Sequence, residues 1–128
     1  THVTSPLFNE KDYLNFIKEF WSMKKKYPTS KSAFSADLIQ KFILSYKGKW
    51  VSHNNKKKKW PRTQDLKPLF VINSAAFLTL KDVYSRKKDR LCNKPLPIVS
   101  RRNSGFDIDT LEDFIQFKNE YNFKKFKS

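Results

Sequence analysis

The sequence has few of the residues that cross-link a small protein, bind structural metals or form tight turns, namely cysteine, histidine and glycine. Among its 128 residues it has one cysteine, two histidines and two glycines. Cys92 alone cannot form an internal disulfide, which excludes a disulfide-stapled secreted scaffold. With His2 and His53 it provides no paired-ligand spacing for zinc, and we expect neither a metal nor a cofactor. Because Gly48 and Gly105 are isolated, they disfavour a glycine-dependent all-β barrel and exclude a glycine-rich phosphate loop.

Long apolar runs are also absent. The longest one, around Leu69–Ile72, is far too short to span a membrane, and the amino end carries no apolar signal segment. No stretch combines a basic helical face with a spare apolar one, so we expect no membrane partner. The chain begins with Thr1, which favours a piece excised from a larger protein. We expect residues 1–8 to form an N-terminal tail and residues 9–126 a single basic domain.

Acidic residues are scarce relative to basic ones. Lys and Arg number 27 against 12 Asp and Glu, for a net charge of +15. Residues 24–102 hold 21 of these bases and only four acids, so the excess is concentrated in the middle of the chain. Such an excess predicts a polyanionic partner, because binding releases counterions and relieves self-repulsion. The 12 phenylalanines, five tyrosines and three tryptophans favour a folded core over disorder.

Residues 9–26 carry the clearest helix signals. Asn9 can cap the helix and Asp12, three residues on, can complete a capping box, while Phe8 and Tyr13 occupy the positions of a hydrophobic staple. Three lysines in the last turn suit the helix dipole, and Pro28 follows the end. The apolar stripe of this helix consists of Tyr13, Phe16, Ile17, Phe20 and Trp21.

Apolar residues at helical spacing also predict a second helix. It would begin at Ser32 or Ser35 and end at Lys47-Gly48, followed by a short strand over residues 49–51. We expect its buried stripe to be Phe34, Leu38, Ile39, Phe42, Ile43 and Tyr46.

The second half of the chain predicts two strands and two more helices. Leu69–Ile72 has the composition of a buried strand, and Leu96–Val99 that of an edge strand, because Pro97 cannot donate to a ladder. Asn73 or Ser74 would cap a third helix between them. Core residues of that helix would be Phe77, Leu80, Val83 and Tyr84.

The fourth helix would open with a capping box formed by Asp109 and Glu112. Its apolar side would comprise Ile108, Leu111, Phe114, Ile115, Tyr121 and Phe126. The expected fold is therefore α+β: a mainly helical small domain of about four helices with a minimal two- or three-stranded sheet.

Four acids crowd the start of this last helix. Clustered carboxylates are cation ligands, and Asp107, Asp109, Glu112 and Asp113 therefore suggest a metal or nuclease site. Their spacing lacks the loop glycine and distant glutamate of a calcium-binding loop. The helix dipole already explains them, so we expect no metal here.

Three basic segments are the candidate binding site. Each follows or separates periodic segments, which places its long side chains on loops or helix ends. Arginine suits bidentate phosphate contacts, and a tryptophan beside a lysine run can stack on a base. The candidate residues are Lys56, Lys57, Lys58, Lys59, Trp60, Arg62, Arg86, Lys87, Lys88, Arg90, Arg101 and Arg102.

These features predict a non-enzymatic nucleic-acid-binding domain, with duplex DNA favoured over RNA, from a nuclear, chromatin-associated protein with a role in transcription regulation. Catalysis finds no support, because His53 has no partner and Cys92 no nearby histidine, and we expect no small-molecule substrate. The alternative is a protein-interaction module that docks on an acidic chromatin, replication or transcription partner. Trp50 or Trp60 would then serve as an anchor.

Overall fold

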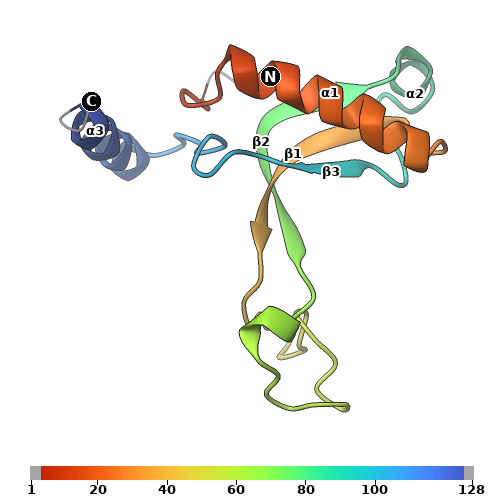
Figure 1. Cartoon of the computed structure of the whole chain (residues 1–128), viewed down its shortest axis with the longest axis vertical. Helices are drawn as coiled ribbons and strands as arrows, with labels where there is room; N and C mark the ends of the chain where they lie inside the picture. The colour runs from red at the N-terminus through yellow and green to blue at the C-terminus, as the bar shows by residue number, and fades with distance from the viewer. Residues whose placement is uncertain (1–3, 126–128) are drawn as a thin grey trace.

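A three-stranded mixed sheet covered by one long helix is the frame of the protein, and two of its strands extend into a protruding arm (Figure 1). The computed structural model describes residues 4–125, and in this range the α+β class is confirmed with three α-helices, not four. The elements are α1 (Glu10–Lys26), β1 (Ser32–Ile39), the 3₁₀ turn η1 (Thr63–Asp65), β2 (Leu69–Thr79), α2 (Lys81–Lys87), β3 (Leu96–Val99) and α3 (Leu111–Lys125).

The sheet has the order β2-β1-β3, with β1 antiparallel to β2 and parallel to β3. The pairing of β1 with β2 runs from Ser32 opposite Thr79 to Ile39 opposite Leu69. β3 accompanies β1 only as far as Ala36. Beyond this point β1 and β2 continue alone, and they form the stem of the arm.

The core lies between α1 and the sheet. Phe16 and Phe20 are the buried residues of α1, and they pack against small residues of the strands such as Ala33 and Ala75. The predicted start of α1 is confirmed: Asn9 and Asp12 exchange both hydrogen bonds of a capping box, at 2.9 and 3.2 Å. The rings of the predicted staple, Phe8 and Tyr13, also meet at 4.7 Å.

The predicted second helix is wrong, because its first half is the central strand β1. A central strand is buried on both faces, and all five residues from Ser32 to Ala36 are buried. A continuous run of small and apolar residues satisfies helical spacing as easily as strand spacing. The residues after Ile39 belong to the arm, where Phe42 is 39% exposed and Tyr46 fully exposed.

The predicted third helix is right only in its second part: α2 is present with Val83 buried as expected, but it does not begin after Asn73 or Ser74. The strand over Leu69–Ile72 is confirmed but continues to Thr79, passing through Ser74 at a left-handed φ of 60°. Helical structure begins only at Lys81 and ends after two turns at Lys88, whose φ is 51°. Asn73 and Ser74, expected as helix caps, instead mark an irregularity in the strand pair.

The edge strand β3 is confirmed at its predicted bounds, and so is a terminal helix. Thr110 and Asp113, rather than Asp109 and Glu112, exchange the capping hydrogen bonds of α3, at 3.2 and 2.8 Å. The apolar side of α3 is not in the core, because Leu111, Phe114, Ile115 and Tyr121 are all exposed. Figure 1 shows the helix projecting away from the sheet. Phe126 lies outside the described residues.

Residues 40–68 form a lobe at the end of the arm, hereafter the arm lobe. Leu66 and Ser52 are its buried residues, and the Gln40 side chain donates to the carbonyls of Gln64 and Leu66. The strand expected over residues 49–51 is reduced to one bridge, between Leu44 and Trp50. The lobe therefore has a small structure of its own.

The segment before α1 is bonded to the part of the protein formed by α1 and the three-stranded sheet, hereafter the head. Ser5 and Phe8 are buried, and the backbone N–H of Ile108 donates to the Thr4 carbonyl at 2.9 Å. Within residues 4–125, none of the helices has the length and apolar character needed to cross a bilayer.

The Asp12 carboxylate joins α1 to the loop after β3, and it gives stability a pH dependence. Burial alone would raise the pKa of Asp12, but hydrogen bonds from Arg101 and the Asn9 backbone hold it below its ordinary value. This stabilisation is present above the ordinary pKa of an aspartate and is lost as the pH falls through the lowered value.

We expect Asp12→Ala to lower the free energy of unfolding at pH 7 by about 1–2 kcal/mol. In urea titrations the deficit should shrink towards pH 2. A pH-independent deficit would contradict this account, and exposed Glu10→Ala is the control.

Candidate functional site

A cleft of about 440 Å³ opens where the arm leaves the head. β1 contributes Asp37 to it, β2 contributes residues 71–74, and the loop before α3 contributes residues 105–107 and Asp109. We call it the acidic cleft, because three of its lining residues are aspartates in a chain of net charge +15.

The Asn73 side chain organises this cleft. Asn73 is 8% exposed, and its carbonyl oxygen accepts a hydrogen bond from Ser35 Oγ at 2.6 Å. Its amide nitrogen donates to Asp37 Oδ1 at 3.2 Å and to Ser100 Oγ at 3.1 Å. One buried amide thus links both strands of the arm to the end of β3, and it fixes the Asp37 carboxylate at the cleft wall.

Gly105 lets the loop before α3 approach this network. A Cβ at position 105 would lie 2.0 Å from Asn73 Nδ2 and 2.4 Å from its Cγ. Only glycine avoids this overlap, and the neighbouring Ser104 is fully buried. The close contact sets the position from which residues 106–109 reach the cleft.

The four acids predicted to serve the helix dipole have separate roles. Glu112 and Asp113 are in the first turn of α3, as predicted, and hydrogen bonds from Thr110 hold the pKa of Asp113 below its ordinary value. Asp107 precedes the helix and lines the cleft instead. Its Oδ1 atom is buried without a hydrogen-bond partner among residues 4–125. Sequence reasoning missed this role; the signal available was that Asp107 lies three residues before the helix cap.

No preformed metal site accompanies these acids. Among the described residues, no three His, Cys, Asp or Glu side chains gather closely enough to hold a metal ion by themselves. Any cation in the acidic cleft would therefore need further ligands from water or from a bound molecule.

The structure does not bring the three predicted basic segments together. Lys56–Lys59 lie in the arm lobe, Arg86–Arg90 lie at and after the end of α2, and Arg101–Arg102 follow β3. Figure 1 shows the lobe at the far end of the arm, α2 at the opposite end of the sheet from α3, and the loop after β3 between the sheet and α3. The single electropositive face expected from the sequence is therefore not formed within residues 4–125.

Several of the predicted phosphate ligands already have protein partners. Arg62 pairs with Asp65 at 3.1 Å, Lys87 contacts Asn93, and the Arg90 guanidinium lies over the Phe77 ring at 4.7 Å. The remaining predicted residues Lys56, Lys57, Lys58, Lys59, Trp60, Arg86, Lys88 and Arg102 are exposed.

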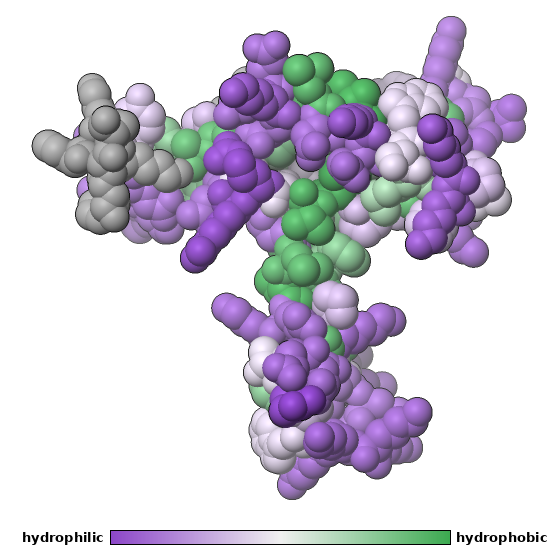
Figure 2. Space-filling model, in the orientation of Figure 1, coloured by the Kyte–Doolittle hydropathy of each residue, from purple (hydrophilic) through white to green (hydrophobic). Residues whose placement is uncertain are grey.

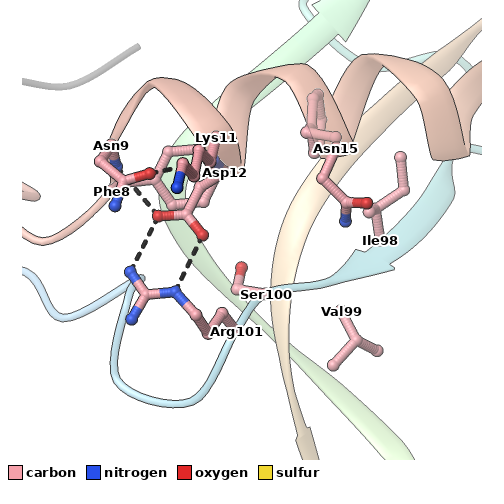
Figure 3. Close-up of a pocket in the computed structure, with 10 residues that line it drawn as sticks. Phe8, Asn9, Lys11, Asp12, Asn15, Ile98, Val99, Ser100 and Arg101 are labelled. Atoms are coloured by element: carbon pink, nitrogen blue, oxygen red, sulfur yellow. Dashed lines mark hydrogen bonds and ion pairs between the residues drawn. The ribbon is translucent and has the colours of Figure 1, made fainter.

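Arg101 is the most strongly engaged of them (Figure 3). Its Nε and one terminal nitrogen donate hydrogen bonds to the two carboxylate oxygens of Asp12, at 3.1 and 3.0 Å. This ion pair lies beside a cleft of about 260 Å³ between α1 and β3. The Asp12 hydrogen bond raises the pKa of Arg101. These contacts make Arg101 a structural clamp between α1 and the β3 end of the sheet.

Cys92, for which the sequence predicts no catalytic role, is half-buried in a basic cleft of about 400 Å³. Burial opposes ionisation, but hydrogen bonds from Ser32 and the Lys31 backbone lower the pKa of the thiol below its ordinary value. Lys94 and Arg86 also line this cleft.

Comparison with known proteins gives one partial similarity. No family model matches the chain. Three N-acylneuraminate cytidylyltransferases of Streptococcus agalactiae, from strains of serotypes III, Ia and V, are each 35% identical to it over 54 residues. The match covers 42% of this chain but only 13% of the length of these relatives.

The contact between Gly105 and Asn73 can be tested by a double-mutant cycle. We expect Gly105→Ala to lower the free energy of unfolding by about 1–3 kcal/mol, because the new methyl group overlaps the Asn73 amide. The cost should be smaller in an Asn73→Ala background, where the overlapping amide atoms are gone. Urea unfolding of the four proteins measures this coupling. Equal costs in both backgrounds would show that the two residues do not meet.

Proposed function

We propose that the acidic cleft is the cation- and phosphate-binding part of a nucleotidyl-transfer site of the N-acylneuraminate cytidylyltransferase type. The observation that carries this proposal is the Asp107 carboxylate oxygen, which is buried at the cleft without a hydrogen-bond partner in the described chain. The partial similarity to the streptococcal cytidylyltransferases supports the same reaction class.

The carboxylates suit a divalent cation that is completed by its substrate. A buried, unpaired carboxylate oxygen is costly unless a cation or donor reaches it. Mg²⁺ is commonly held by one or two carboxylates together with substrate phosphates, rather than by an all-protein cage. Asp107 and Asp37 would be the protein ligands, with Asp109 nearby on the same cleft. When bound, the cation would stabilise the charge of the reacting phosphates.

The other residues of the cleft would position these ligands. Asn73 donates to Asp37 and so orients its carboxylate, while Gly105 sets the approach of the loop that carries Asp107. Both would act through the aspartates rather than on the nucleotide itself. This arrangement resembles metal sites whose ligand geometry depends on hydrogen bonds from the surrounding shell.

This proposal departs from the prediction of a non-enzymatic duplex-DNA-binding domain, which relied on three basic segments sharing a face. The nuclear, chromatin-associated setting and the acidic protein partner stay predictions. Nucleic-acid binding by the basic segments likewise stays a prediction.

Removing the charge of Asp107 should separate function from stability. We expect Asp107→Asn to weaken Mg²⁺-dependent binding of CTP by about tenfold or more, because a cation ligand is lost. The same change should leave stability unchanged or higher, since an unpaired buried charge disappears. Isothermal titration of CTP with and without Mg²⁺, together with thermal unfolding, measures both effects.

The matched control is Asp113→Asn, which removes an acid in the first turn of α3 that caps this helix and does not line the cleft. It should leave CTP binding intact. Absence of Mg²⁺-dependent CTP binding in the unmodified chain, or equal weakening by the two variants, would argue against a nucleotide site in this cleft. Cytidylyl transfer to an N-acylneuraminate, measured with labelled CTP, then tests the reaction itself.

A further inference from the structure

We propose that the basic cleft beside α2 binds the phosphate groups of a small molecule, without the help of a metal ion. This cleft of about 400 Å³ is formed by the segment between α1 and β1, by α2, and by the loop before β3. Its size falls within the range of pockets that hold small organic ligands. The proposal does not rest on the function assigned to the acidic cleft.

The basic cleft is remote from the acidic cleft. Lys31, in the basic cleft, directly precedes β1, whereas Asp37, in the acidic cleft, lies near the other end of this strand. At about 3.3 Å per residue, the extended chain from Ser32 to Asp37 spans about 16 Å. Figure 1 also shows α2 at the opposite end of the sheet from α3, whose preceding loop lines the acidic cleft. The two clefts are therefore separate sites.

Positive charge dominates the walls of the basic cleft. Among the described residues that line it, Lys31, Arg86, Lys87 and Lys94 are basic and only Asp82 is acidic. A hydrogen bond from Lys31 and, to a smaller extent, the charge of Arg86 hold the pKa of Asp82 below its ordinary value. Four bases against one acid leave a net charge of +3 in the cleft. Figure 2 shows hydrophilic side chains projecting from the end of the head where α2 lies.

Arg86 and Lys94 are the side chains best placed to receive an anion. Both are exposed, and neither forms a salt bridge within residues 4–125. Lys87 contacts the side-chain oxygen of Asn93, which is neutral and leaves the charge of the ammonium group unopposed. A guanidinium can donate two parallel hydrogen bonds to a phosphate, whereas an ammonium acts as a point charge. Arg86 would thus orient a phosphate that Lys87 and Lys94 help to neutralise.

Hydrogen bonds hold the three segments of the wall together. Ser30 Oγ donates to the Lys94 carbonyl at 2.7 Å, and the Lys31 N–H donates to the Cys92 sulfur at 3.5 Å. The Leu80 N–H, just before α2, donates to the Lys31 carbonyl at 3.0 Å. These bonds join the segment before β1 to each of the other two segments. A cleft that is already formed loses less entropy when its ligand binds.

The charge of the cleft favours a phosphate over a carboxylate ligand. A carboxylate group carries one negative charge, whereas a phosphate monoester carries about −1.5 to −2 at pH 7 and offers three acceptor oxygens. The three cations without a carboxylate partner, Arg86, Lys87 and Lys94, match such a group better. They can also hold it directly, whereas the acidic cleft would repel a phosphate unless a cation lay between them. Dependence on Mg²⁺ therefore distinguishes the two clefts.

Isothermal titration of the whole chain in EDTA tests the proposal with inorganic phosphate, pyrophosphate, CTP and the dicarboxylate succinate. We expect saturable binding of the phosphate compounds and about tenfold weaker binding of succinate, because charge-assisted bonds to phosphate are stronger and more numerous. The order of affinity among the phosphate compounds identifies the kind of molecule that supplies the group. Absence of binding by all three, equal affinity for succinate, or binding that appears only after Mg²⁺ is added would overturn the proposal.

Variants of Arg86 and Lys94 locate the site. We expect Arg86→Ala and Lys94→Ala each to weaken pyrophosphate binding about tenfold, because each removes a charged donor. Arg86→Lys should cost less, since it keeps the charge and loses only the paired hydrogen bonds. The matched control is Lys81→Ala, an exposed residue of the same helix that does not line the cleft. Equal losses from Lys81→Ala and Arg86→Ala would mean that net charge alone is responsible, and thermal unfolding confirms that each variant is folded.

Cys92 shows whether the anion occupies this cleft. It lines the cleft and is the one cysteine of the chain, so alkylation by neutral iodoacetamide follows a single thiol. We expect pyrophosphate to slow this alkylation several-fold in the unmodified chain, but not in Arg86→Ala at the same concentration. Binding without protection of Cys92 would place the anion elsewhere and overturn the assignment. Asp107→Asn should change neither binding nor protection, so failure here and failure of the proposed cytidylyl site are distinguishable.

Discussion

The buried amide of Asn73 is the contact on which the rest of the architecture depends. It lies where the sheet narrows from three strands to two, and its hydrogen bonds reach Ser35 and Asp37 on β1 and Ser100 after β3. A buried side-chain amide needs all its partners, because an unsatisfied one costs free energy. The network therefore fixes the junction of head and arm, and with it the wall of the acidic cleft.

This junction also explains how charge is distributed over the molecule. A two-stranded ribbon is at best marginally stable by itself, so the arm requires a fixed base and a small core at its far end. The junction supplies the base, while buried Leu66 and the edge-to-face contacts of Phe42 with Trp50 and Trp60 hold the lobe together. Asp37 is satisfied at the junction by the neighbouring Asn73 amide. The lysines occupy the lobe, where water solvates them until an anion arrives.

The sequence predicted those elements whose signals are local. The α1 cap, the edge strand with Pro97 and the terminal helix depend on neighbouring residues, and all three are present. β1 was missed because its burial depends on its pairing with β2 and β3 and on the packing of α1, and no local pattern reports these long-range contacts. The extension of β2 was missed for a related reason. Ser74 adopts a left-handed φ within the strand, and Asn73 uses its cap-forming side chain for long-range contacts.

The chemical class of the ligands could be predicted from the sequence, but the position of the site could not. Composition indicates anionic ligands, because a net charge of +15 raises the local concentration of nucleotides and nucleic acids around the whole molecule. Composition does not predict where these ligands bind. Arg101 is paired with Asp12, and of the acids near α3, Asp113 caps the helix while Asp107 and Asp109 line the cleft. A long-range positive field and a local acidic cleft are compatible. The field would attract phosphates, and under the proposed function the carboxylates would hold a cation through which those phosphates are oriented.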